Sequence, residues 1–257
     1  MSRPKRTTFS QIIVFTMLIL GIGLVAVSGF YTSSFLAILG VAIIFWGTLL
    51  LYFTPSKHLP LTLFNASAEG AVANIERLIL ELNLSERGIY LPPKNLKNIE
   101  SSLIFIPKSP KTPLPTPEET NEKQLTNEKN GAFVTPPGSG LSRLFEEELG
   151  VSFTKTNLVQ VQFNLPKLLV ECLELAEKAE ILIQGNIVTV EIVGSVLDEV
   201  CRQTASQPRT HKQVGCLLGS AIACALAKAT GKPVTIQNET RNQEAKITRI
   251  EYQILEG

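Results

Sequence analysis

The sequence VGCLLGSAIACALA, residues 214–227, carries no charge and consists almost entirely of small or apolar residues. We expect a helix from about Gln213 to Thr230, because Gly231 and Pro233 follow as typical stop signals. A helix that is apolar on nearly every side is buried rather than amphipathic. This segment is therefore predicted to be the core helix of a globular domain, and its small residues allow a sheet to approach closely.

The segments on either side of this helix are rich in β-branched residues. After it, 234–237 and 247–255 predict an antiparallel pair of strands joined across 238–246. Before it, 197–204 predicts a short helix, and 181–192 predicts a β-hairpin that turns at Gln-Gly-Asn. The apolar spacing from Leu165 to Ala179 predicts a longer amphipathic helix.

The first half of the domain has the same mixed character. Helical spacing from Asn65 to Asn83 predicts an amphipathic helix, and two short strands at 88–93 and 102–107 each end in proline. A further strand near 131–135 leads into a helix at 141–149. The whole pattern predicts an α+β fold of antiparallel strands with helices packed on one face.

Residues 108–130 differ in composition, with four prolines, mixed polar residues and little to bury. We predict a flexible surface insert here. The insert is either a tolerated loop or a segment that binds a partner or is modified.

The N-terminal region contains no Asp, Glu, Lys, Arg or His from residue 7 to residue 56. A bilayer core needs about 20 apolar residues per helix, so this stretch predicts a hairpin of two transmembrane helices, at about 11–30 and 35–53. Residues 1–56 then form a membrane anchor and residues 57–257 a cytoplasmic domain. The absence of ionisable groups at membrane depth favours anchoring in the lipid bilayer over transport.

Basic residues flank the apolar stretch at Arg3, Lys5, Arg6 and Lys57, while the turn between the spans has none. The positive-inside rule therefore predicts a multi-pass protein of the cell membrane with cytoplasmic N- and C-termini. In an alternative reading the first span is a cleaved signal peptide.

Charge and cysteine content restrict the partners. The 24 Lys and Arg residues nearly balance the 23 Asp and Glu residues, and three of the basic ones lie in the first six positions. The domain thus lacks the basic surplus that nucleic-acid binding requires. The cysteines show no CxxC spacing and are expected to be small core residues in a reducing compartment: Cys172, Cys201, Cys216 and Cys224.

Two places in the sequence are candidate binding sites. The turn that contains Gly138, Ser139 and Gly140 is an anion-site candidate, because a glycine-rich strand-to-helix turn exposes backbone N–H groups. No Walker or GxGxxG pattern accompanies it, so an ordinary helix start is the alternative. The second candidate is a ligand pocket beside the small residues of the core helix, at Gly215, Gly219 and Ala223.

His211 precedes the core helix and could act as an acid or base, or could bind a metal together with Cys201 and Cys216. Neither role has a supporting spacing, because structural metal sites usually contain a close pair of ligands. We therefore expect no catalytic residue, no metal and no cofactor.

Several motifs resemble those of an archaeal family of membrane-anchored proteins of unknown function. They are the two spans, YLPP at 90–93, IP at 106–107, the variable insert, TPPGSGL at 135–141 and the small-residue helix before KPV at 232–234. The resemblance covers most of the chain and implies the same architecture, with no established activity.

The C-terminal third is also similar to the end of the 4-vinyl-reductase-type small-molecule-binding domain, through GKPV at 231–234, Glu239-Thr240 and the last strand. In that family the helix and strands close over a ligand, often an apolar one, and cysteines accompany the last two strands. This chain has Arg241 to Lys246 there instead, so the resemblance implies at most a shared fold.

These observations predict a noncatalytic, membrane-anchored domain that engages a protein partner or assembles with itself. The first alternative is a sensor or carrier of a small apolar ligand, with a pocket between the helix 213–230 and its sheet. The second is an enzyme built from residues distant in sequence, such as Arg209, His211 and Glu239.

Overall fold

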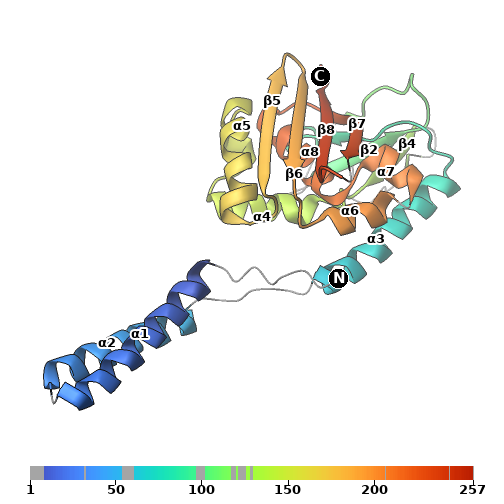
Figure 1. The fold of residues 1–257 in the computed structure, drawn as a ribbon. Helices are drawn as coiled ribbons and strands as arrows, with labels where there is room; N and C mark the ends of the chain where they lie inside the picture. The colour runs from blue at the N-terminus through green and yellow to red at the C-terminus, as the bar shows by residue number, and fades with distance from the viewer. Residues whose placement is uncertain are drawn as a thin grey trace. The chain divides into compact units, whose positions relative to one another are not determined.

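The computed structural model describes residues 9–31, 33–53, 61–96, 102–116, 120, 126–127, 130–205, 207–242 and 244–256. The chain forms two compact units, residues 1–60 and residues 61–257 (Figure 1).

The first unit is a pair of apolar helices, α1 (Phe9–Tyr31) and α2 (Ser34–Phe53), which pack side by side. A Cβ atom on Gly21 would lie 3.0 Å from the carbonyl oxygen of Gly40, and one on Gly40 would lie 2.9 Å from that of Gly21. These glycines therefore allow the two backbones to approach closely. Large apolar side chains cover the outside of the pair, among them Phe15, Ile19, Ile22, Phe30, Phe35, Ile38, Phe45 and Trp46.

The helices expected at about 11–30 and 35–53 are therefore present, whereas their position in a membrane stays a prediction. Among the described residues, only Pro208–Thr230 has the length and hydropathy of a membrane span, and it is 83% buried within the second unit, as a core segment is. In the N-terminal pair, the apolar segments whose side chains the structure describes are Phe15–Tyr31 and Ser34–Leu50, and both are shorter than that length.

The second unit is built on one antiparallel sheet of eight strands, in the order β3-β4-β2-β1-β7-β8-β6-β5. Along β8, Ile250, Tyr252 and Ile254 are buried while the residues between them are more exposed, so one face of this part of the sheet points to the core. The strands are β1 (Ile89–Leu91), β2 (Leu103–Pro107), β3 (Thr126–Asn127), β4 (Gly131–Val134), β5 (Lys178–Gln184), β6 (Ile187–Val193), β7 (Val234–Asn242) and β8 (Ile247–Ile254).

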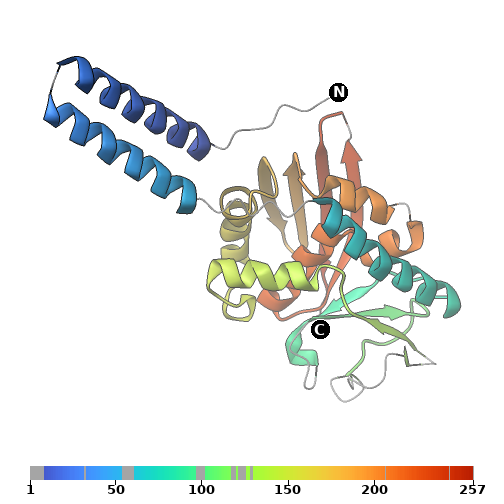
Figure 2. The same cartoon turned by 90° about the horizontal axis from the view of Figure 1, so that it is seen from below.

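Helices pack against the core-facing side, with α8 at the centre (Figures 1 and 2). Every residue of α8 from Leu217 to Ala227 is buried, as the small and apolar composition predicts. The predicted mixed α+β fold with antiparallel strands is confirmed. The helices are α3 (Leu61–Glu81), α4 (Ser139–Leu149), α5 (Leu158–Lys167), α6 (Asp198–Ala205), α7 (Pro208–Val214) and α8 (Leu217–Thr230), with short helical turns at Pro93–Asn95, Phe153–Lys155 and Leu168–Cys172.

A second, smaller apolar cluster lies apart from the main core, on strands β1, β2 and β4. It consists of Leu91, Leu96, Phe105 and Phe133. The rings of Phe105 and Phe133 lie 5.2 Å apart between centroids. Leu114 of the insert packs against this cluster, so the start of the insert contributes to the fold.

The predicted insert 108–130 lies partly outside the described residues, at 117–119, 121–125 and 128–129. Within it, β3 pairs with β4 through Thr126 and Asn127. Its flexibility stays a prediction.

The predicted helix from Leu165 to Ala179 is wrong. Helix α5 begins earlier, because Asn157 and Gln160 form a reciprocal capping box. It runs through Pro166 into a wider helical turn that ends at Cys172, and Glu174 adopts a left-handed backbone conformation with φ of 50°. The chain then enters β5 at Lys178. The apolar spacing therefore reflected two packed elements rather than one helix.

The predicted single helix from Gln213 to Thr230 is also interrupted. Helix α7 ends at Val214, and Gly215 has a φ of 76°, which is a conformation that glycine adopts readily. Cys216 then caps α8, its Sγ accepting a hydrogen bond from the Gly219 amide at 3.3 Å. The break gives the core helix a new N-terminus inside the protein.

Candidate functional site

A β-bulge in strand β7 determines which side chains reach the core face. Val234 and Ile236 stand opposite Ile254 and Tyr252, but the register shifts between Ile236 and Asn238. After the shift, Glu239 pairs with Ile250, and Arg241 pairs with Thr248. Because side chains alternate along a strand, one extra residue transfers the odd-numbered positions to the buried face.

The bulge is held by a side chain from outside the strand. Arg87 donates hydrogen bonds from its Nη1 to the carbonyl oxygens of Ile236 and Gln237. The cationic group thus satisfies backbone acceptors where the sheet ladder is interrupted. The prediction that residues 238–246 only join two strands is wrong, because β7 continues past the bulge to Asn242.

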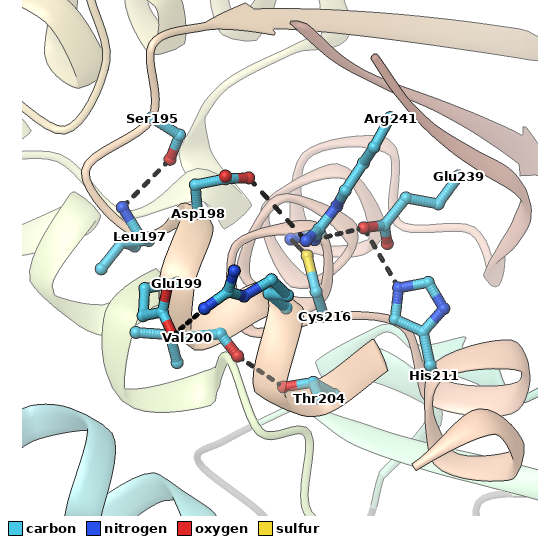
Figure 3. A network of polar contacts seen from close by, with 12 residues as sticks. Ser195, Leu197, Asp198, Glu199, Val200, Thr204, His211, Cys216, Glu239 and Arg241 are labelled. Atoms are coloured by element: carbon cyan, nitrogen blue, oxygen red, sulfur yellow. Dashed lines mark hydrogen bonds and ion pairs between the residues drawn. The ribbon is translucent and has the colours of Figure 1, made fainter. Parts of the chain in front are cut away.

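Glu239 is the centre of a polar cluster between β7, α6 and α7 (Figure 3). Its side chain is only 4% exposed, and its Oε1 accepts a hydrogen bond from Arg241 Nη2 at 2.8 Å. His211 Nε2 lies 3.2 Å from the same oxygen. On the outer side, Arg241 Nη1 lies 3.8 Å from Asp198 Oδ1, and the Asp198 side chain is exposed. The cluster therefore leads from the protein surface into the core.

The electrostatics of this cluster favour the ionised carboxylate. Burial pushes the pKa of Glu239 upward, but His211 and Arg241 outweigh it and hold the pKa below its usual value. Glu239 and Cys201 in turn hold the pKa of Arg241 above its usual value despite partial burial. The second carboxylate oxygen, Oε2, is buried and accepts no hydrogen bond from the described residues.

Two thiols lie beside the charged groups. Cys201 of α6 and Cys216 at the start of α8 are both buried and line the same small hollow, where the interaction between their thiols shifts the pKa of each. The hydrogen bond from Cys216, assisted by Arg241, lowers the pKa of Cys201 although burial opposes it. The same hydrogen bond, together with burial, raises the pKa of Cys216. Cys201 is therefore the more acidic thiol of the pair.

A small hollow adjoins these groups. It is lined by both thiols and Arg241, together with Ile192, Ser195, Asp198, Leu218, Thr248 and Ile250. Its volume of about 10 Å³ corresponds to about one water molecule. The described residues therefore leave space for a very small molecule beside the thiols but none for an organic substrate.

The predicted ligand pocket on the core helix lies in a tightly packed region. A Cβ atom on Gly215 would meet Ile236 Cδ1 at 2.5 Å, and one on Gly219 would meet Ile250 Cδ1 at 3.2 Å. Ala223 is fully buried. The small residues thus serve close packing of helix on sheet, and ligand binding beside them stays a prediction.

The predicted anion site lies at the start of α4, where backbone donors are already engaged. Gly138 donates its amide hydrogen to Ser220 Oγ at 3.1 Å, and Ser139 donates to the Pro136 carbonyl at 3.0 Å. A Cβ atom on Gly138 would lie 2.1 Å from the Ala221 nitrogen, so this glycine allows α4 to begin against α8. Gly140 has open space around its Cα. Anion binding at this turn stays a prediction.

Some of the residues that the sequence had suggested as joint candidates lie close together in the structure. His211 meets Glu239, and Cys201 meets Cys216, whereas Arg209 is exposed. No group of three His, Cys, Asp or Glu side chains with metal-binding geometry occurs among the described residues. Arg241 and Asp198 had not been identified from the sequence. The alternation of inward and outward side chains along β7 would have placed Arg241 on the core side, but only if the position of the bulge had been known.

Chemically, the cluster combines a buried ion pair with an acidic thiol that has a second thiol next to it. Such a carboxylate can orient Arg241 and His211, and the positive charge of Arg241 favours the thiolate of Cys201. The arrangement suits proton or redox chemistry on a molecule of a few atoms.

Comparison with known proteins identifies the family of the chain. No curated protein and no solved structure matches the sequence. A family model described as a domain of unknown function, DUF7982, matches residues 1–253. The predicted membership in an uncharacterised family is confirmed. Because the match extends over both structural units, the chain belongs to the DUF7982 family.

Proposed function

We propose that this chain is a membrane-anchored protein whose cytoplasmic domain, residues 61–257, acts through noncatalytic contact with proteins at the membrane surface, including further copies of itself. The archaeal origin implied by the resemblance belongs to the same proposal. The observation that carries it is the apolar exterior of the α1–α2 pair.

The exterior of this pair has the character of a lipid-facing surface. Ile19 is 70% exposed, Ile38 is 70% exposed and Phe45 is 62% exposed. Exposure of such a surface to water is unfavourable, because the burial of each CH₂ group stabilises a protein by about 0.8 kcal/mol. Helices α1 and α2 contain 23 and 20 residues, which is the length needed to span a bilayer core of about 30 Å. The basic residues Arg3 and Lys57 favour cytoplasmic ends on both sides of the anchor.

The domain itself presents an apolar stripe on α5 that supports contact with proteins. Val159 is 57% exposed and Phe163 is 63% exposed, and the two stand four residues apart on one side of the helix. Exposed aromatic side chains are frequent anchors of protein interfaces. Because a membrane tether confines the domain to a surface, even a weak contact of this kind gains effective concentration.

A small-ligand sensor remains the alternative, but the packing gives it little support. A drug-sized ligand occupies a pocket of roughly 300–1,000 Å³, whereas the hollow beside Cys216 has a volume of about 10 Å³. An enzyme acting on an organic substrate meets the same difficulty.

The anchor is tested by alkaline carbonate extraction of membranes from cells that make the full-length chain. We expect the full chain to stay in the membrane pellet and a variant lacking residues 1–60 to appear in the supernatant. Recovery of the full chain in the supernatant would contradict the anchor.

The interaction is tested by amine-reactive crosslinking in the same membranes. We expect crosslinked species of higher mass with the natural sequence and at least a severalfold reduction with Phe163→Ser. Leu144→Ser is the matched control, because Leu144 is an exposed apolar residue on α4 at 37% exposure. Recovery of monomer alone, or equal loss with both variants, would refute the proposal that α5 mediates protein contact.

A further inference from the structure

We propose that Cys201 and Cys216 form a peroxide-sensitive dithiol, which hydrogen peroxide entering the adjoining hollow oxidises to an intrachain disulfide. The inference goes beyond the proposed membrane function and does not depend on it.

The two cysteines border the same hollow in the reduced protein. They are close enough that each thiol shifts the pKa of the other, although Cys201 comes from α6 and Cys216 from the start of α8. A disulfide requires two cysteines whose side chains point toward each other at short range. The two remaining cysteines differ in their surroundings, since Cys172 is exposed after α5 and Cys224 lies inside α8.

The surroundings of the pair distinguish a reactive thiol from a resolving one. The guanidinium of Arg241 lines the same hollow and attracts negative charge on Cys201, and the hydrogen bond from Cys216 also favours the Cys201 thiolate. The pKa of Cys216 is raised, so this residue retains its proton at first. Cys201 is thus the nucleophile, because the thiolate is the reactive form of cysteine.

The hollow limits the oxidant by size. Its volume of about 10 Å³ corresponds to about one water molecule, and hydrogen peroxide is only slightly larger than water. Asp198 borders the hollow with an exposed side chain, which places this side of the cluster near solvent. A bulky disulfide such as oxidised glutathione does not fit beside the two thiols in the folded protein.

The reaction balances with one peroxide per pair. The Cys201 thiolate attacks one oxygen of hydrogen peroxide, so an S–O bond forms, the O–O bond breaks, and hydroxide leaves. Hydroxide takes the proton of Cys216 and becomes water. The Cys216 thiolate then attacks the Cys201 sulfur, the S–S bond forms and the S–O bond breaks. The second hydroxide leaves as water after taking up the proton that Cys201 had lost. Two thiols are oxidised and one peroxide is reduced to two waters.

The test uses the purified full-length chain in detergent, treated with hydrogen peroxide and then denatured in the presence of an alkylating reagent. Trypsin cleavage and mass spectrometry should find the peptide that ends at Arg202 linked to the peptide that contains Cys216. The linkage should persist in Cys172→Ser and Cys224→Ser and be lost in Cys201→Ser. Two freely alkylated thiols after peroxide treatment would overturn the proposal.

A second variant keeps the proposal testable if Cys201→Ser does not fold. In Cys216→Ser the nucleophile remains without its resolving partner, so sulfenic acid should accumulate at residue 201 and be trapped by dimedone. Peroxide should also oxidise the natural pair at least about tenfold faster than oxidised glutathione at equal concentration. Dimedone labelling only at Cys172, or equal rates with both oxidants, would contradict the assigned roles.

Discussion

His211 Nε2 lies 3.2 Å from Glu239 Oε1, although the two residues are far apart in sequence and belong to α7 and β7. The contact depends on two interruptions of regular structure. The helix break at Gly215 ends α7, and the β7 bulge turns Glu239 inward. Both interruptions cost little free energy, because Gly215 adopts its positive φ without steric strain and Arg87 donates hydrogen bonds to the carbonyl oxygens at the bulge.

Replacing the buried carboxylate should destabilise the domain. We expect Glu239→Gln to lower the free energy of unfolding by about 2–4 kcal/mol, because Arg241 would lose its anionic partner in a largely buried position. Urea denaturation of the full-length chain in detergent, followed by circular dichroism, measures the change. Glu251→Gln is the control, because this carboxylate lies on the exposed sheet face and should change the same quantity by less than about 0.5 kcal/mol.

Stability should decrease in acid because two carboxylates have lowered pKa values in the folded state. Glu239 is stabilised by His211 and Arg241, and Glu146 accepts hydrogen bonds from Lys228 and Ser152. Burial opposes both shifts without reversing them. For each group the folded pKa lies below the ordinary value of 4.5. The unfolded state therefore binds more protons in this range, and the contribution is complete above the ordinary pKa and is lost as the pH falls through the folded one.

The measurement is the urea midpoint of the natural chain between about pH 3 and pH 7. It should be nearly flat toward neutral pH and should fall in the acid range. Glu239→Gln should flatten part of the acid decline. An identical slope in the variant and the natural chain would exclude Glu239 as a source of the pH dependence.

Glycine at position 138 should be required for packing of α4 against α8. We expect Gly138→Ala to destabilise the domain by about 3 kcal/mol, because the new Cβ would overlap the Ala221 backbone. Gly140→Ala, two residues later in α4, meets open space and should leave stability unchanged or raise it by up to about 1 kcal/mol. Thermal unfolding of both variants measures the two changes in stability. A loss of stability in Gly138→Ala alone indicates that Gly138 is needed for packing, whereas equal losses would indicate that this turn tolerates no substitution.

Arg241 should control the reactivity of Cys201. We expect Arg241→Gln to slow peroxide oxidation at neutral pH by about tenfold and to move the pH dependence of the rate upward, because the thiolate loses a neighbouring positive charge. The rate follows from the loss of free thiol with time at several pH values. Arg249→Gln, on the exposed face of β8, is the control and should leave the rate unchanged.

The sequence was informative wherever composition alone decides burial. The segment 214–227 could be recognised as a core helix because it has no polar face, and Gly185 fixed the β5–β6 hairpin, where it adopts a φ of 61°. The helix predicted from Leu165 failed because an apolar period of a few residues does not distinguish a helix from a wide turn followed by a strand.

The candidate site could not be predicted in the same way. The contact of Glu239 with His211 depends on the β7 register, which is set by pairing with β8 rather than by local propensity. The proximity of Cys201 to Cys216 depends on the packing of α6 against α8, and no spacing in the sequence encodes it. His211, Glu239 and the two cysteines could be named as candidates from the sequence, whereas Arg241, Asp198 and the geometry of the contacts could not.

Because β7 contains one extra residue, the number of residues in this strand decides which of its side chains face the interior. Deleting Gln237 would remove the bulge and make the register with β8 continuous, so Glu239 and Arg241 would stay opposite Ile250 and Thr248 and would still face the core. Inserting one residue between Asn238 and Glu239, without a second bulge, would instead turn both charged side chains outward without any change in their own identity. The length of this one strand, and not only its composition, therefore specifies which side chains the core contains.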